Sequence, residues 1–337
     1  MVKIDNCRVK PTGWKHRDRS YLRSATEVHW SGLKYNWAEV RRRHAVLSVL
    51  PTIPNIQLLS LYDADINFAQ QAIIFGLSTL RTLVVHSCRL HPSTNPLPLS
   101  HVTTLRITNT DMQTTRHLLT ILATTVETLE VGYPDHTIAP ILQGGLIELS
   151  KLSAISLTRL PYGARLAISS TFKRYTSITT ICILLHLDLL EMSLDDSHLP
   201  ALRSLTCDHQ LAMSLIPNRP VTAYVEVGSY REAGLLDLLN TLSKTSARIT
   251  RLTIFIFDSL HSLLPSLATT LQSLEELTLR PYTRMSWLGY HPPDLFSTLP
   301  LHNPYGTVAM ILPILQRVVI WVTHIEFTAY SHCFGES

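Results

Sequence analysis

A triplet of apolar residues, spaced apolar-x-x-apolar-x-apolar, recurs along most of this 337-residue sequence. Such spacing is that of a short strand with its apolar members on one side. One unit cannot bury that side alone, whereas a stack of units can. In so apolar a chain a few triplets arise by chance, but ten at nearly constant spacing do not. The copies begin at Ile56, Leu80, Val102, Val126, Leu152, Ile178, Leu202, Ile249, Leu274 and Leu315, with a weaker one at Thr222/Val225/Val227.

Between several triplets the apolar spacing becomes helical. Leu118, Ile121 and Leu122 follow one predicted strand, and two further runs are Leu235/Leu238/Leu239/Leu242 and Leu260/Leu263/Leu264/Leu267. These spacings predict amphipathic helices. Up to Leu274 the triplets lie 20 to 27 residues apart, within the period of leucine-rich repeats. The sequence therefore predicts an α/β leucine-rich-repeat solenoid, a horseshoe with a parallel sheet on the concave side and helices on the convex side.

The predicted repeats are irregular. Leucine-rich repeats usually carry Asn or Cys eight positions after the first apolar residue, and here only Cys88 meets that rule. We expect residues 1–20 to form a flexible basic arm, 21–323 the repeat domain and 324–337 a tail that shows no repeat. Residues 21–50 predict an N-terminal cap or first repeat with a strand over 26–30. The Pro-rich stretch 281–304 predicts a loop insertion.

The arm carries most of the positive charge. Residues 1–47 hold 11 Lys and Arg against 4 Asp and Glu, a net +7, in a chain whose total is +4. Arg41, Arg42 and Arg43 suggest either nucleic-acid contact or a solvated helix face, and the second reading is favoured because Trp37 and Val40 occupy the other side. The apolar runs are too short for a membrane span, and five scattered cysteines give no disulfide framework. We expect a cytoplasmic or nuclear protein that binds no membrane.

The segment Leu199–Val227 shows a more particular pattern: a strand ending in Leu-Thr-Cys, a short helix, and then Arg219-Pro220-Val221-Thr222. With the following unit, Leu235–Leu252, it resembles fungal F-box/leucine-rich-repeat-like proteins. The resemblance spans about residues 50–320 and implies a substrate receptor of a ubiquitin ligase, whose F-box docks a Skp-type adaptor. The N-terminal region lacks the Leu-Pro-x-Glu-like helix of an F-box. Two alternatives therefore stay open: an F-box lost or lying outside this chain, and a repeat protein with no ligase link.

Motifs for catalysis are missing. The sequence has no H-E-x-x-H, G-x-S-x-G or glycine-rich phosphate loop, and we predict no enzyme and no cofactor. His86, Cys88 and His91 could suggest a metal, but the register sends Cys88 inward and His86 outward, so a packed cysteine is favoured. The pairs Asp63/Asp65 and Asp195/Asp196 are expected at strand-to-helix turns, where Asp commonly caps a helix.

The best candidate site is the set of outward strand positions between and just after the apolar anchors. Mixed charge with aromatic residues is typical of protein interfaces, where Tyr, Trp and Arg supply many hot spots. The sequence therefore predicts a protein-binding concave face for an unknown protein target. Its candidate residues are Tyr62, His86, Arg106, Glu130, Tyr133, Arg159, Asp208, Tyr224, Glu226, Phe255, Arg280, Arg317 and Trp321.

Overall fold

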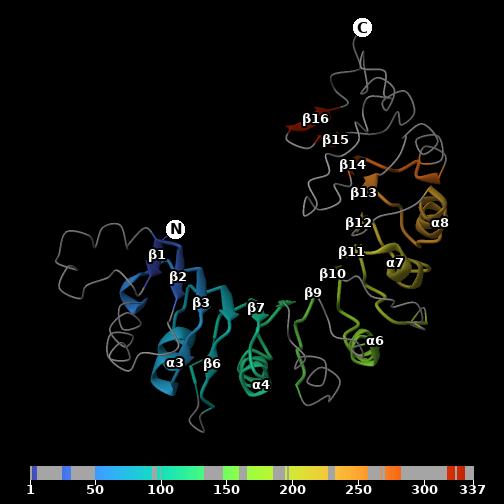
Figure 1. Ribbon diagram of the computed structural model, residues 1–337. Coiled ribbons are helices and arrows are strands. Elements are labelled where there is room, and N and C mark those ends of the chain that lie inside the picture. The colour runs from blue at the N-terminus through green and yellow to red at the C-terminus, as the bar shows by residue number, and fades with distance from the viewer. Residues whose placement is uncertain are drawn as a thin grey trace, which may run out of the picture. The chain divides into compact units, whose positions relative to one another are not determined.

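The fold is taken from a computed structural model, in which the chain divides into unit 1 (Met1–Tyr175) and unit 2 (Thr176–Ser337). The strands of each unit lie side by side with helices along one side of them (Figure 1). The structure describes residues 2–5, 25–31, 50–92, 97–98, 100–132, 147–158, 165–184, 194–195, 197–226, 232–256, 267, 270–281, 317–322 and 325–330.

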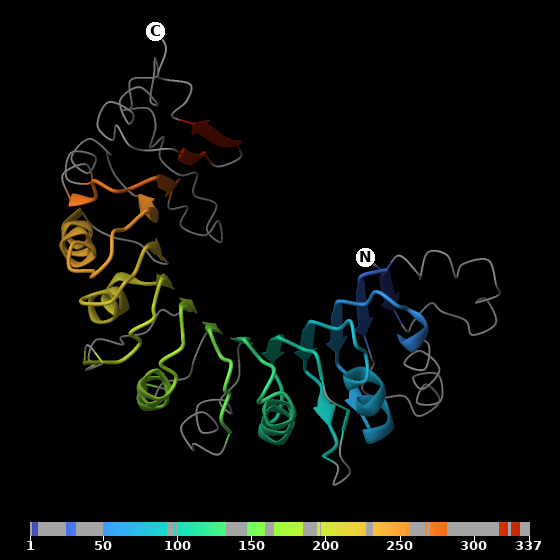
Figure 2. The same cartoon turned by 180° about the vertical axis from the view of Figure 1, so that it is seen from behind.

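Unit 1 is built on a parallel sheet of consecutive strands. Each strand pairs in parallel with the next in the order β1-β2-β3-β5-β7-β8-β9. Each connection leads back to the end of the sheet where the previous strand began. Equivalent residues of successive strands therefore lie side by side (Figure 2). Their bounds are β1 Val2–Asp5, β2 Glu27–Ser31, β3 Leu58–Tyr62, β5 Thr82–His86, β7 Thr104–Thr108, β8 Thr128–Val131 and β9 Ala154–Thr158.

In the described connections of unit 1 lie a short 3-10 turn, η2 (Leu50–Thr52), and the α-helices α3 (Phe68–Phe75), α4 (Met112–Ile121) and α6 (Arg165–Arg174). A second, two-stranded parallel sheet pairs β4 (Asp65–Ile66) with β6 (Arg89–Leu90). Helix α3 begins with a reciprocal cap between the Asn67 and Gln70 side chains and backbones. The predicted capping by Asp63 or Asp65 is wrong, because Asn67 holds the cap and Asp65 lies in β4.

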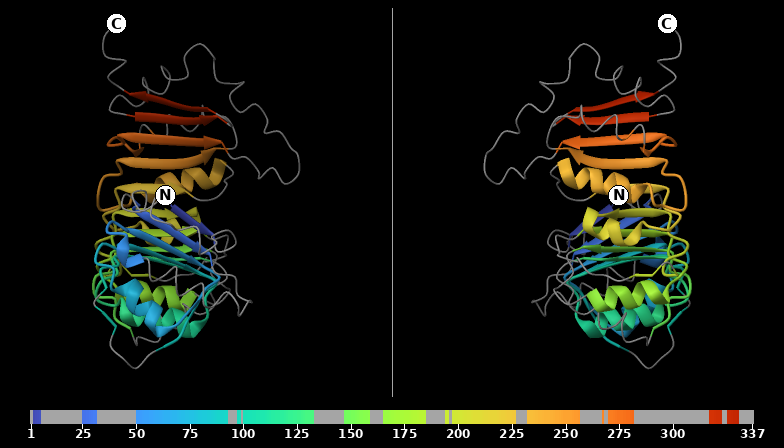
Figure 3. Two further views of the ribbon diagram at one scale, coloured as in Figure 1. Left: turned by 90° about the vertical axis from the view of Figure 1, so that its left-hand side faces the viewer. Right: turned by 90° about the vertical axis from the view of Figure 1, so that its right-hand side faces the viewer.

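Unit 2 repeats the arrangement with helices α7 (His209–Leu215) and α8 (Glu232–Leu242). Its strands pair in parallel from β10 to β15, and the last pair, β15 with β16, is antiparallel. The side views show these strands stacked one after another, with the last two pointing in opposite directions (Figure 3). Their bounds are β10 Thr180–Leu184, β11 Ser204–Cys207, β12 Ala223–Glu226, β13 Arg251–Ile256, β14 Glu276–Pro281, β15 Arg317–Val322 and β16 Ile325–Tyr330.

The cores of both units are made by the predicted triplets. Ile56, Leu59 and Leu61 are almost fully buried, and so are the described members of the triplets from Leu80 to Leu274, apart from the weak one. In register, the middle members of neighbouring triplets face each other, as Leu59 faces Leu83 and Leu252 faces Leu277. The chain is thus an α/β leucine-rich-repeat solenoid, as the triplet spacing predicts.

One backbone carbonyl in each repeat accepts two hydrogen bonds from the next repeat. The Gln57 carbonyl oxygen accepts from the backbone N–H groups of Arg81 and Thr82, both at 2.8 Å. The Arg81 carbonyl then accepts from Thr103 and Thr104, and the pattern continues along each unit. The accepting residue directly follows the first apolar residue of its triplet. We call this pair of hydrogen bonds the joint, and its position identifies where the triplet of each repeat begins. The acceptors are Thr26, Gln57, Arg81, Thr103 and Glu127 in unit 1, and Thr179, Arg203, Thr222 and Thr250 in unit 2.

The weak triplet at Thr222/Val225/Val227 is assigned one residue too late. Thr222 is the doubly accepting residue, which makes Val221 the first anchor. Tyr224 and Glu226 face Leu205 and Cys207 across the strand pair and are buried, whereas Val225 is half-buried opposite Thr206. The triplet of this repeat is therefore Val221/Tyr224/Glu226.

Among the described residues of unit 1, tight turns follow β3, β5 and β7. Asp63, Ser87 and Asn109 occupy equivalent positions with φ values of 49°, 52° and 54°. Asp, Ser and Asn have short polar side chains, and Asn and Asp are several-fold enriched in this left-handed region. The next residue in each turn, Ala64, Cys88 or Thr110, is buried at the position where an asparagine ladder would lie. Cys88 Sγ lies within hydrogen-bond distance of two carbonyl oxygens, that of Leu61 in the preceding repeat at 3.4 Å and that of His86 at 3.2 Å, so a thiol stands where the usual amide would lie.

Two strands differ from the predicted boundaries. β1 lies inside the stretch expected to be a flexible arm, and β16 inside the stretch expected to be a tail without a repeat. β2 agrees with the strand predicted over 26–30. The predicted helix of the N-terminal cap and the loop insertion after Pro281 lie outside the described residues. Among the described helices, none has the length and apolar character needed to cross a membrane.

Candidate functional site

The open face of unit 1 is the side of its sheet that points away from the helices. Strand side chains alternate between two sides, so residues that flank the buried anchors point to this face. The two central rows are set by register. His29, Ser60, Val84, Arg106 and Glu130 are neighbours in one row, and Tyr62, His86 and Thr108 in the other.

Four predicted residues meet on this face. The rings of Tyr62 and His86 lie 5.7 Å apart between centroids, tilted by 48°. Arg106 Nε contacts Glu130 Oε2 at 2.5 Å, with 51% and 31% of the two side chains exposed. A half-exposed ion pair of this kind contributes little stability, typically below about 1 kcal/mol. The Arg106/Glu130 pair is therefore a minor contribution to the stability of unit 1.

Two further residues of this face were missed as candidates. Glu27 and His29 lie on β2, and the alternation of the predicted strand over 26–30 would have placed them there. Glu27 Oε2 lies 3.9 Å from His29 Nε2, and that buried ring nitrogen has no hydrogen-bond partner among the described residues. They extend the polar part of the open face by one strand.

Three candidates in unit 2 do not form an open surface. Tyr224 and Glu226 are 1% and 0% exposed, because the corrected register of β12 turns both inward. Asp208 caps α7: its side chain accepts a hydrogen bond from the Leu211 backbone N–H at 2.9 Å. The prediction that Tyr224 and Glu226 belong to the exposed face is therefore wrong. Asp208 has a structural role as the N-cap of α7.

The remaining candidates are placed only by strand. Phe255, Arg280, Arg317 and Trp321 lie on β13, β14 and β15, with Phe255 facing Arg280 in register. Their side chains, and all of Tyr133 and Arg159, lie outside what the structure describes. Their binding role stays a prediction.

The residues considered for a metal do not converge. His86 points to the open face, Cys88 is buried, and His91 Nε2 pairs with Asp65 Oδ1 at 2.6 Å beside the small β4–β6 sheet. Burial and the hydrogen bond of Cys88 support the packed-cysteine interpretation. In the part of the chain that the structure describes, no group of three or more His, Cys, Asp or Glu is placed to hold a metal ion.

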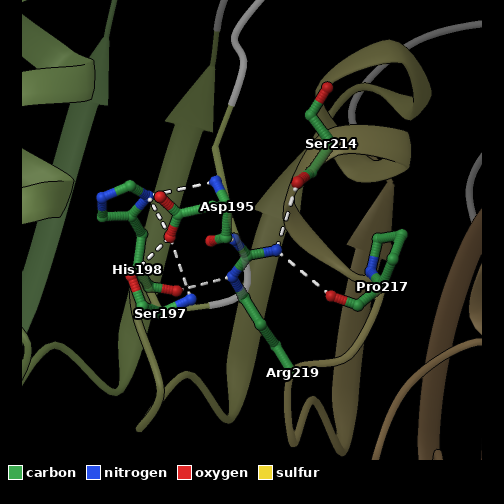
Figure 4. A network of polar contacts seen from close by, with 6 residues as sticks. All are labelled: Asp195, Ser197, His198, Ser214, Pro217 and Arg219. Carbon is green, nitrogen blue, oxygen red and sulfur yellow. Dashed lines mark hydrogen bonds and ion pairs between the residues drawn. The ribbon is translucent and has the colours of Figure 1, made fainter.

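Arg219, the first residue of the Arg-Pro-Val-Thr segment, is a buried anchor of unit 2. It is 1% exposed, and its guanidinium donates four hydrogen bonds to backbone carbonyl oxygens (Figure 4). Nε and Nη2 reach those of His198 and Asp195, both at 2.8 Å, and Nη1 reaches those of Ser214 and Pro217, both at 3.2 Å. One side chain thus joins the loop before β11 to the end of α7.

The loop held by Arg219 contains Asp195, Ser197 and His198, which superficially suggests a catalytic triad. In such a triad the imidazole stands between the hydroxyl and the carboxylate. Here the carboxylate stands in the middle: Asp195 Oδ1 accepts from the Ser197 hydroxyl and lies 3.1 Å from His198 Nδ1. This order organises a turn, and the imidazole is placed against Asp195 and not against the serine hydroxyl.

Burial shifts the pKa of two groups near α7. It raises the pKa of the Cys207 thiol, with Asp208 adding to the effect, and it lowers the pKa of His209. At neutral pH a thiol with a raised pKa is protonated and a poor nucleophile. Cys207 is therefore a packing residue.

No protein-family model matches the sequence, and no curated protein matches it. Among solved structures, the chain is similar to an internalin of Listeria monocytogenes, with 16% sequence identity and a TM-score of 0.30 over 78% of this chain and 77% of that one.

Proposed function

We propose that this chain is a protein-interaction scaffold that holds a partner protein on the open face of its repeats. The observation that carries the proposal is the grouping of Tyr62, His86, Arg106 and Glu130 on consecutive strands of unit 1. These strands are fixed by a buried core and by paired backbone hydrogen bonds. A rigid frame that presents aromatic and charged side chains loses little conformational entropy when a partner binds.

The finer form of the proposal follows from the resemblance of Leu199–Val227. A substrate receptor of a ubiquitin ligase, acting in the cytoplasm or nucleus, would hold its target on this face and contact a Skp-type adaptor through another segment. The repeat architecture supports the holding role. The Arg219 network accounts for one residue of the resemblance in structural terms, since that arginine stabilises unit 2.

Affinity capture of the full chain followed by mass spectrometry tests the proposal. The Tyr62→Ala/Arg106→Ala variant should lose the captured partner, while Arg116→Ala, an exposed residue on α4 at the helical side, should keep it. Identical captures from all three proteins would overturn the open face as the binding surface. Recovery of a Skp-type adaptor with every variant supports the ligase form, and its absence from all of them leaves a scaffold without a ligase link.

A further inference from the structure

The Nδ1 atom of His198 lies beside a hydrogen-bond donor and a hydrogen-bond acceptor of one and the same residue. The backbone N–H of Asp195 donates to Nδ1 at 3.1 Å, and Oδ1 of the Asp195 carboxylate also lies 3.1 Å from that nitrogen (Figure 4). A ring nitrogen without a proton accepts a hydrogen bond, whereas a protonated one donates. Nδ1 can therefore satisfy only one of these two contacts at a time.

The protonation state of His198 decides which contact is made. In the neutral imidazole that carries its proton on Nε2, Nδ1 accepts from the Asp195 N–H. In the imidazolium both ring nitrogens carry protons, so Nδ1 donates to the carboxylate and the backbone N–H loses its acceptor. Histidine is the side chain whose charge most commonly changes near neutral pH. The two arrangements therefore exchange when the ring gains or loses a proton.

The ring is shielded from water, and an anionic and a cationic group flank its residue. Only 12% of the His198 side chain is exposed, against 68% of Asp195, so water does not readily replace the Asp195 N–H at Nδ1. The carboxylate of Asp195 belongs to the same turn. The buried guanidinium of Arg219 comes from the segment after α7 and donates to the His198 carbonyl oxygen at 2.8 Å. Among the described residues, these are the charged groups in contact with His198.

The other hydrogen bonds of the turn do not depend on the charge of the ring. The Ser197 N–H donates to Asp195 Oδ1 at 3.0 Å, and the Asp195 carbonyl oxygen accepts from the His198 N–H at 3.1 Å and from Arg219 Nη2 at 2.8 Å. The Asp195 N–H belongs instead to the peptide bond that enters the turn from residue 194. Its release frees the entrance of the turn and leaves the Arg219 network intact.

We propose that the turn of residues 195–198 is a pH-responsive element of unit 2. Neutral His198 holds the backbone N–H of Asp195 and closes the entrance of the turn. Protonated His198 pairs with the Asp195 carboxylate and releases that N–H. This proposal concerns unit 2 alone and does not depend on which surface binds a partner.

NMR spectroscopy of the full chain, with the NMR-active nitrogen isotope placed only in Asp and His, tests the proposal. An N–H···N hydrogen bond couples its two nitrogen nuclei, so at about pH 8 the Asp195 amide should be coupled to His198 Nδ1. At about pH 5, below the usual range of histidine titration, the coupling should vanish. Protection of the Asp195 amide from hydrogen exchange, relative to an unstructured peptide at the same pH, should fall about fivefold, as expected for one lost hydrogen bond.

Two variants separate the ring from other causes of pH dependence. His198→Gln keeps an acceptor that does not titrate, so protection of the Asp195 amide should become the same at both pH values. His91→Gln removes another His–Asp pair, with Nε2 at 2.6 Å from Asp65 Oδ1, and should leave the wild-type behaviour unchanged.

Three results would overturn the proposal. The first is a wild-type Asp195 amide that stays coupled and equally protected at both pH values. The second is a His198 ring that remains neutral at the lower pH. The third is a pH dependence of the Asp195 amide that persists in His198→Gln.

Discussion

The hydroxyl of Tyr224 donates a hydrogen bond to the carbonyl oxygen of Cys207, 3.1 Å away in the neighbouring repeat. Both residues are buried, so the bond is shielded from water. A tyrosine therefore serves as an inward anchor of β12, a position that an aliphatic residue occupies in most other repeats of this chain.

Removing this hydroxyl should weaken unit 2. Tyr224→Phe keeps the ring and is expected to lower the free energy of unfolding by about 1 kcal/mol, the net value of a typical buried hydrogen bond. Urea denaturation followed by tryptophan fluorescence measures the change. Tyr62→Phe, on the open face, is the matched control and should leave the stability unchanged. Equal effects of the two substitutions would contradict the inward assignment of Tyr224.

Arg219 should be intolerant of conservative replacement. Lysine keeps the charge but lacks the planar fork that reaches four carbonyl groups, so Arg219→Lys should destabilise unit 2 by roughly 2–4 kcal/mol. Hydrogen exchange should accelerate in residues 194–226. Arg203→Lys changes an exposed arginine and should have almost no effect. Unaltered exchange in the Arg219→Lys variant would refute the anchoring role.

Gly132 is required by a close approach between two strands of unit 1. A Cβ at this position would lie 2.7 Å from Oγ1 of Thr108. Gly132→Ala should therefore cost about 1–3 kcal/mol, the range for overpacked sites. Adding Thr108→Ala should recover part of the loss, which a double-mutant cycle by urea denaturation measures. Strictly additive effects would mean that the two side chains do not compete for space.

The stability of unit 1 should fall at acid pH through His117. Its Nε2 donates to Gln71 Oε1 at 2.8 Å, because the Gln71 amide nitrogen already donates to two carbonyl groups. Burial lowers the pKa of His117 below its ordinary 6.5, so the folded protein binds this proton less readily than the unfolded chain. The resulting stability is present above pH 6.5 and is lost as the pH falls through the folded pKa.

His117→Gln retains a donor and removes the titration. Urea midpoints at about pH 7.5 and about pH 5, on either side of the unperturbed histidine pKa, should differ less for this variant than for the wild-type protein. The exposed His101→Gln serves as control and should follow the wild type. An unchanged pH dependence in His117→Gln would exclude this residue as the source.

The sequence predicts the anchors of most repeats because burial of aliphatic side chains decides their register. It fails at β12, where Val225 and Val227 are more hydrophobic than the buried Tyr224 and Glu226. There the position of Val221 and the paired carbonyl of Thr222 determine the register. Hydrophobicity alone carries no information about that backbone joint.

The candidate site was likewise predictable in part: the placement of its residues followed from the sequence, and their contacts did not. Strand alternation alone placed Tyr62, His86, Arg106 and Glu130 on the open face of unit 1. It could not predict that Arg106 would be paired with Glu130, since that depends on rotamers and cross-strand distance. It also gave no sign of the Arg219 network, which joins segments separated by a helix and a turn.

The carbonyl oxygen that accepts two hydrogen bonds lies at the same position in successive repeats. The backbone of one repeat can therefore be joined to that of another at this position with the same two bonds. Joining Leu80 directly to Thr103 would remove residues 81–102 and leave Gln57 facing the N–H groups of Thr103 and Thr104, with the same two bonds to receive. Recombination at this joint would keep both of its backbone N–H groups paired, although the exchange shown here also removes β6, the partner strand of β4. Each such exchange would change the length of the solenoid by one repeat and would add or remove the open-face side chains of that repeat, as the loss of His86 does here.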